Sequence, residues 1–194
     1  MNRQLTFRQY RGIDLTLFAI ILCVTESVLV MAANKWFADQ LYTVSVSAAI
    51  VCIVLMRWGP YAAIHAVLAG LVYCLAAHGT GQQYLIYCVG NLFGLGGLIL
   101  VKTVGDKGIR ANSVLSVAYA LAVQLLMQLG RGVMALLLGY GLDAAFRFLT
   151  TDALSTLFTV VIIWIARRLD GIFEDQKSYL FRVQAEKEEE KGGY

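Results

Sequence analysis

Long apolar blocks separated by short charged segments constrain the fold of this chain more than any other feature. Hydrophobic residues make up 59% of its 194 residues and charged residues only 15%. A soluble domain of this length carries more surface charge, and a helix needs about 20 apolar residues to cross a bilayer. The sequence therefore predicts an all-α, polytopic membrane protein in the lipid bilayer. Its six transmembrane helices are expected at residues 15–33, 42–56, 61–77, 84–101, 114–140 and 146–166.

The positive residues predict the orientation. Lys and Arg gather before the first span, between the second and third, between the fourth and fifth, and after the sixth, whereas the opposite side holds only Lys35 and Arg147. Cytoplasmic loops are enriched in Lys and Arg, so both termini are expected in the cytoplasm. Residues 1–170 are expected to form the membrane domain. Residues 171–194 are expected to form a cytoplasmic tail, amphipathic at first and then charged.

Sequence motifs for enzymatic chemistry are missing. The glycine-rich stretch GNLFGLGG (residues 90–97) lacks the Gly-Lys-Ser/Thr ending that binds phosphates, and neither a GxSxG nor an HExxH motif occurs. The four cysteines lie within predicted spans without a CxxC pair. We therefore expect no enzyme activity, cofactor, metal site or nucleic-acid partner, and any ATP that drives this protein must be hydrolysed by another subunit.

Polar residues inside the apolar spans form stripes along helix faces. An intramembrane charge such as Arg131 indicates a functional site by default, because a guanidinium in hydrocarbon is costly unless it is paired or solvated. At 1.5 Å per residue, the stripes fall in the outer half of the membrane, where a pocket open to the exterior would lie. The stripes are Gln124, Gln128 and Arg131; Tyr84, Tyr87 and Asn91; and Asp152, Ser155 and Thr159, with Glu26 at similar depth.

Two interpretations of these stripes remain open. In one, Arg131 holds an anionic or zwitterionic solute bidentately, and Glu26 either balances the arginine or binds a cationic part of the solute. In the other, Glu26 and Arg131 only neutralise each other and the glutamines join helices.

Small residues also recur at four-residue intervals, which lets helices approach closely in lipid. Such a face meets either an internal neighbour or another protein, and the sequence leaves both possible. The candidate partner-interface residues are Ala19, Cys23 and Ser27 in the first span and Ala62, Ala66 and Gly70 in the third.

A chain of this length, with six spans, both ends inside, no ATPase motif and an outer polar pocket, resembles the S component of an energy-coupling factor (ECF) transporter. Ala19 and Cys23 lie where that family carries an AxxxA contact, with Cys in place of the second alanine. The stretch MRWGPYAAIHAVLAGL (residues 56–71) is similar to the family's tight turn and small-residue helix.

The resemblance implies a substrate-capturing subunit for vitamin-like micronutrients in a prokaryotic cytoplasmic membrane. Its partners would be a transmembrane coupling subunit and two ATPase subunits. In this family the loop after the first span closes over substrate, and the matching stretch NKWFADQLY offers Asn34, Trp36 and Phe37. The candidate substrate-binding residues are Glu26, Asn34, Trp36, Tyr84, Tyr87, Asn91, Gln124, Gln128, Arg131, Asp152 and Ser155.

A second class of protein also fits the sequence. A non-transporting membrane scaffold of the MreD (rod-shape) type likewise has several short spans and no catalytic motif. For a scaffold, the polar stripes would hold helices together, and the charged C-terminal helix would bind the partner.

Overall fold

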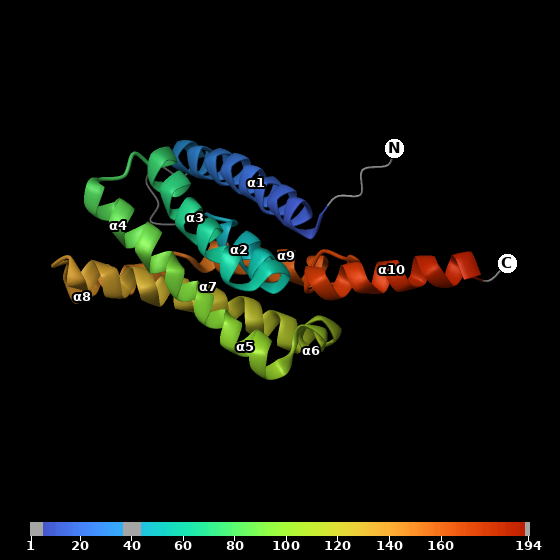
Figure 1. The fold of residues 1–194 in the computed structure, drawn as a ribbon. Helices are drawn as coiled ribbons and strands as arrows, with labels where there is room; N and C mark the ends of the chain where they lie inside the picture. Colours follow the sequence, from blue (N-terminus) through green and yellow to red (C-terminus); the bar gives the residue numbers. More distant parts are fainter. Residues whose placement is uncertain (1–5, 37–43, 193–194) are drawn as a thin grey trace.

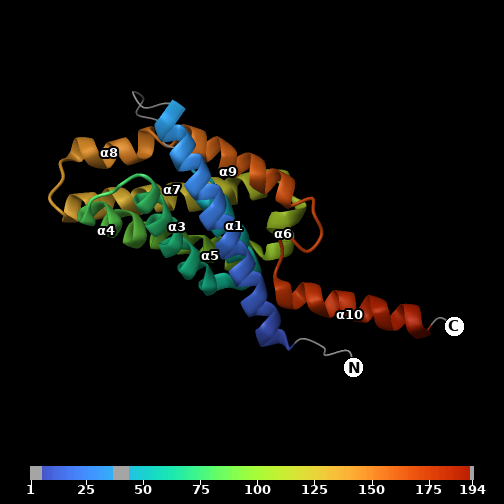
Figure 2. The same ribbon diagram turned by 90° about the horizontal axis from the view of Figure 1, so that it is seen from above.

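The computed structural model describes residues 6–36 and 44–192, and their regular structure is helical throughout, without a strand. Most of the helices pack side by side into a bundle, and α10 extends away from one end, next to the start of α1 (Figures 1 and 2). The helices are α1 (Phe7–Trp36), α2 (Ser47–Trp58), η1 (Gly59–Tyr61), α3 (Ala62–Ala76), α4 (Gly81–Gly90), η2 (Asn91–Gly96), α5 (Gly97–Val104), α6 (Asp106–Ala111), α7 (Ser113–Leu137), α8 (Leu142–Thr150), α9 (Ala153–Ala166) and α10 (Gln176–Gly192).

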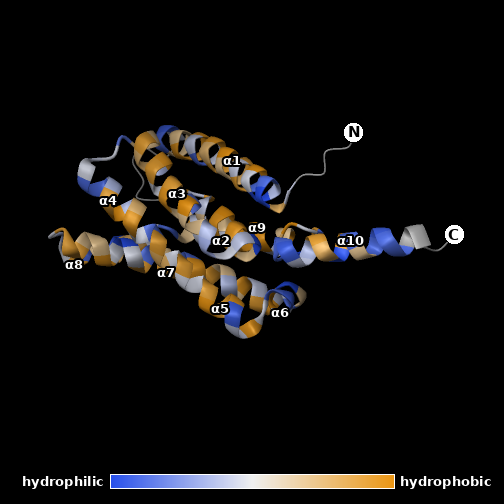
Figure 3. Cartoon of the chain, in the orientation of Figure 1, coloured by the Kyte–Doolittle hydropathy of each residue, from blue (hydrophilic) through white to orange (hydrophobic). Residues whose placement is uncertain are grey.

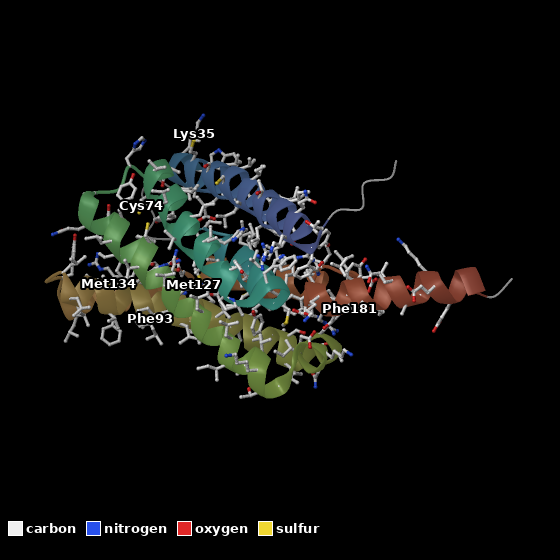
Figure 4. The ribbon with its side chains drawn as sticks, viewed as in Figure 1. Lys35, Cys74, Phe93, Met127, Met134 and Phe181 are labelled. Atoms are coloured by element: carbon white, nitrogen blue, oxygen red, sulfur yellow. The ribbon has the colours of Figure 1, made fainter. Side chains whose placement is uncertain are left out.

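Five helical stretches of the described residues are long and apolar enough to cross a membrane. Hydrophobic residues follow the bundle helices, whereas α6 and much of α10 are hydrophilic (Figure 3). The predicted all-α class is confirmed, and the helices have the length and composition of a multi-pass membrane protein. The stretches are Phe7–Trp36, Ser47–Ala76, Gly81–Val104, Ser113–Leu137 and Leu142–Ala166.

The second of these stretches turns back on itself. Gly59 ends α2 with a positive φ of 58°, which glycine adopts without a steric penalty, and Pro60 follows it. Near its beginning α1 contacts both the end of α2, through Asp14 and Arg57, and the beginning of α3, through Leu15 and His65. Ser47 at the beginning of α2 and Tyr73 near the end of α3 line one cavity, so α2 and α3 run antiparallel, with the turn where the sequence predicts it.

Helix α2 lies in the centre of the bundle. All of its residues are buried, and α1, α3, α7 and α9 surround it. A helix that is hydrophobic all round is stable only when it is enclosed. The run AAIVCIVLM therefore forms the middle of the core, whereas α1 keeps one broad apolar face exposed.

Two sequence-predicted boundaries are wrong. Helix α1 continues to Trp36, so Asn34 and Trp36 are helical and do not lie in a loop, while Phe37 is outside the described residues. The tail also does not separate at residue 171. Phe173 is fully buried with its ring 5.8 Å from that of Tyr119, and Gln176 accepts a hydrogen bond from the Tyr10 hydroxyl at 2.8 Å. Burial of these groups ties residues 171–176 to the bundle.

Candidate functional site

The site begins with the buried guanidinium of Arg131 on α7. Its Nη1 lies 2.9 Å from Oδ2 of Asp152, its Nε donates to Oδ1 of Asn91 at 2.8 Å, and its Cζ lies 4.9 Å from the centroid of the Tyr87 ring. The side chain is 7% exposed. Asp152 is therefore the direct counterion of Arg131, whereas Glu26, which one of the two open interpretations paired with Arg131, makes no ion pair with it.

Two glycines bring α4 and α7 close enough to form this arrangement. A Cβ added to Gly90 would lie 2.6 Å from the backbone nitrogen of Arg131, and one added to Gly130 would overlap the carbonyl oxygen of Gly90. The helices thus cross with their backbones in contact, as small residues allow in membrane proteins. Asn91 and Arg131 each directly follow a crossing glycine, so the crossing sets their separation.

The partners of Arg131 are held from different elements. Nδ2 of Asn91 donates to the carbonyl oxygen of Ala66 in α3 at 3.1 Å, which leaves its Oδ1 directed at the guanidinium. Asp152 lies at the break between α8 and α9, inside the single span expected at 146–166. The break places a carboxylate in the bundle interior, where it is 4% exposed.

Glu26 approaches the same point from α1. Its side chain is 1% exposed, and its Oε2 accepts the backbone N–H of Val46 at 3.2 Å. Nearby, the backbone N–H of Ser45 donates to Oγ of Ser155 at 3.0 Å, and the Oγ atoms of Ser45 and Ser47 lie 2.6 Å apart. Among the described residues, no ion pair involves Glu26.

A small cavity of about 10 Å³ lies between these groups. That volume holds about one water molecule, whereas pockets for drug-sized ligands measure roughly 300–1,000 Å³. A vitamin-sized solute therefore requires the site to widen. We call the polar and aromatic residues around this cavity the Arg131 cluster: Glu26, Ser45, Ser47, Tyr73, Tyr87, Asn91, Arg131 and Asp152, with Ala69 completing the wall.

The structure brings some of the sequence-predicted site residues together and leaves others apart. Glu26, Tyr87, Asn91, Arg131 and Asp152 line the cavity, and Ser155 adjoins it through Ser45. The remaining predicted residues do not line it. Gln124 and Gln128 are buried along α7, Tyr84 packs half-buried in a neighbouring apolar cluster, and Asn34 and Trp36 are exposed near the end of α1.

Sequence reasoning missed three residues of the cluster. Ser45 and Ser47 are two closely spaced hydroxyl residues at the start of the largely apolar second span, and that spacing was an available signal. Tyr73 stacks on Tyr87 with ring centroids 4.4 Å apart. Nothing in the sequence distinguishes Tyr73 from an interface aromatic residue, because its role depends on how α3 and α4 cross.

The small-residue stripe of α3 is internal. Ala62, Ala66 and Gly70 are buried, and a Cβ added to Gly70 would lie 2.6 Å from the backbone nitrogen of Cys88 in α4. These three residues are therefore inaccessible to a partner protein in this structure, which corrects the interface prediction. Ala19, Cys23 and Ser27 of α1 are half-buried beside its exposed apolar face.

A second buried arginine lies near the opposite end of α2. Nη2 and Nε of Arg57 bind Oδ1 and Oδ2 of Asp14 at 2.5 and 2.9 Å, and Trp58 Nε1 donates to the same carboxylate. Nη1 of Arg57 donates to the carbonyl oxygens of Gly171 and Ile172. We call these five residues the Arg57 cluster. It joins α1, α2 and the segment before α10.

The fold and the site together define a class, a multi-pass helical membrane protein with a buried, charged cavity toward one end of its bundle. Comparison with protein-family models, with curated proteins and with solved structures gives no match for this chain. Its function is therefore argued from the site.

Proposed function

We propose that this chain is the substrate-capturing subunit of an ATP-driven uptake transporter for a small polar, vitamin-like solute, similar to an ECF S component. The observation that carries the proposal is the Arg131 cluster. Separate helices bring two carboxylates, a guanidinium, an amide and several hydroxyls to one cavity inside an apolar bundle. Intramembrane charges that converge on a cavity are typical of a solute site.

The proposed topology has six passes and cytoplasmic termini. Helices α2 and α3 contain 12 and 15 residues, about 18 and 22 Å at 1.5 Å per residue. Each is a short crossing, joined by the turn at Gly59–Tyr61. Lys107, Arg110, Arg167 and Arg168 lie around one surface hollow near α10, and the positive-inside rule assigns that side to the cytoplasm. The Arg131 cluster then lies in the outer half of the bundle.

The exposed face of α1 is the proposed docking surface for the coupling subunit. Leu17, Ile20, Val24 and Val28 are each more than half exposed along it, beside the half-buried stripe Ala19, Cys23 and Ser27. A neighbouring helix could approach α1 closely there. The sequence has no phosphate-binding loop, so energy would come from two ATPase subunits attached to the coupling subunit.

Affinity purification from native membranes tests the proposal. The wild-type chain is expected to carry a coupling subunit and ATPase subunits, and Ala19→Leu is expected to lose them while remaining folded. Ala63→Leu on α3 is the matched control and keeps them. ATP hydrolysis by the pure chain, or co-purification of cell-wall or cytoskeletal proteins without ATPases, contradicts the proposal.

The second candidate is the scaffold, and one observation favours it. The cavity is nearly closed, and no buried nitrogen or oxygen of the Arg131 cluster lacks a hydrogen-bond partner. The two such atoms among the described residues, His65 Nδ1 and Arg167 Nε, lie elsewhere. Under this alternative the cluster only holds helices together, and co-purification shows cytoskeletal partners.

A further inference from the structure

The charges around the cavity of the Arg131 cluster do not balance. Its wall carries the carboxylates of Glu26 and Asp152 but only one guanidinium. Arg131 binds Asp152 at 2.9 Å and Asn91 at 2.8 Å, so its charge is already compensated. Glu26 is left as the carboxylate without an ion-pair partner among the described residues.

The sequence between the two described ranges does not supply the missing cation. Residues 37–43 (FADQLYT) contain no Lys, Arg or His and add one aspartate. A buried carboxylate without a cation is costly, even when it accepts a hydrogen bond. The empty site therefore favours a positively charged guest over a negative one.

The other walls fit the same kind of guest. Tyr73 and Tyr87 line the cavity with stacked rings. Arg131 already lies over the Tyr87 ring, so Tyr73 is the ring whose face could attract a guest cation. The hydroxyls of Ser45 and Ser47 can accept hydrogen bonds from an ammonium or a ring N–H.

We propose that the cavity captures an organic cation, a small molecule whose ammonium group or cationic ring nitrogen is held by Glu26. This inference rests on the proposed capture function and names its substrate class. The Arg131–Asp152 pair then forms a neutral part of the wall, and an anion held bidentately by Arg131, as the sequence suggested, would compete with Asp152 and Asn91 for the guanidinium.

Binding would also loosen a backbone contact just before α2. Glu26 holds the backbone N–H of Val46 at 3.2 Å, one residue before α2 begins. A cation that binds the carboxylate competes with this N–H group. Capture of the guest and release of the Val46 N–H group are therefore coupled through one carboxylate.

Three probes of nearly equal shape and different charge test the inference: 1-methylnicotinamide (cation), nicotinamide (neutral) and nicotinate (anion). Their affinities for the full chain in lipid nanodiscs are measured by ligand-observed NMR at millimolar concentration. The cation is expected to bind about tenfold more tightly than the neutral probe, with the anion weakest. Glu26→Gln keeps an acceptor for Val46 and is expected to abolish the cation preference.

Glu186→Gln removes an exposed carboxylate of α10 and is the matched control, which leaves the ranking unchanged. The wild-type ranking is itself decisive if Glu26→Gln fails to fold. An anion that binds most tightly, a cation preference that persists in Glu26→Gln, or binding of none of the three overturns the inference. Co-purification of ATPase subunits decides separately whether the transport proposal stands.

Discussion

The two buried arginines have the same kind of counterion but different surroundings. Arg57 and Asp14 form a bidentate pair, with one carboxylate for one guanidinium, and backbone carbonyls and an indole N–H satisfy the remaining groups. Arg131 uses one nitrogen for Asp152 and another for Asn91, and a second carboxylate lines the same cavity.

Charge balance and free volume distinguish a structural ion pair from a candidate site. The Arg57 cluster has balanced charge, and its contacts join segments more than 100 residues apart in sequence. The Arg131 cluster has two carboxyl groups for one guanidinium, and it encloses a cavity. Burial alone does not separate them, because both arginines are about 5% exposed.

The largest effect is expected from the Arg57 cluster. Arg57→Ala leaves the buried Asp14 without a cation and the carbonyl oxygen of Ile172 without its donor, while Gly171 keeps only the hydrogen bond from Gln176. Loss of one partner of a buried pair costs about 3–5 kcal/mol, so we expect a large fall in folded yield and in the thermal unfolding midpoint in detergent. Arg8→Ala, an exposed residue of α1, is the control. An Arg57→Ala protein that melts like the wild type would refute the structural role.

The second effect concerns the pair Arg131 and Asp152. Arg131→Gln leaves two buried carboxylates without a cation, and Asp152→Asn removes the direct ion-pair partner of Arg131. Each is expected to destabilise the protein by about 2 kcal/mol or more. The double variant is expected to regain stability but not solute binding, because the wall of the cavity has changed. Thermal unfolding and solute binding are measured on all four proteins. Full recovery of binding in the double variant would make the pair purely structural.

The third effect tests the helix crossing. Gly90→Ala places a methyl group 2.6 Å from the backbone of Arg131, so α4 and α7 must move apart. Overpacking costs about 1–3 kcal/mol and is expected to weaken binding through the shift of Asn91. Gly12→Ala, which meets no atom within 4 Å, is the control for thermal unfolding. Equal unfolding midpoints for the two variants would show that the crossing tolerates a side chain.

The smallest effect belongs to an exposed carboxylate near α10. Hydrogen bonds from Arg110 and Arg182 hold the pKa of Asp170 below its usual value of about 3.9. A lowered folded-state pKa stabilises the protein above the unfolded pKa, and this contribution is lost as pH falls through the folded value. Because Asp170 is solvent-exposed, Asp170→Asn is expected to reduce the pH dependence of unfolding below pH 4 only slightly. A large change at pH 7 would contradict this.

Part of the fold and of the candidate site can be predicted from the sequence, and part cannot. The apolar blocks predict the helices and the turn before Ala62, because length and hydropathy are local properties. The stripes place Arg131, Asn91 and Asp152 on inward faces, and the structure joins them. The contacts of Arg131 with Asn91 and Asp152 depend on the Gly90–Gly130 crossing and on the break before α9. No local sequence pattern specifies either feature. For the same reason the sequence left the partner of Glu26 open.

The Arg57 cluster was hidden for a related reason. In the sequence, Asp14 and Arg57 resemble ordinary charged residues at the ends of two spans. The positive-inside rule already explains the position of Arg57, so the sequence gives no reason to look for an ion-pair partner. Their burial depends on Phe173 and Gln176 folding back from the tail onto the bundle. The periodicity of apolar residues along the chain does not predict this long-range contact.

Native mass spectrometry of the gently purified protein tests the central claim most directly. The wild-type chain is expected to carry one small molecule per protein, and Glu26→Gln is expected to lose it while its thermal unfolding midpoint stays close to that of the wild type. The exposed control Glu186→Gln keeps the molecule. Wild-type protein without a bound solute, or equal occupancy in Glu26→Gln, would contradict the assignment of the Arg131 cluster as a solute site.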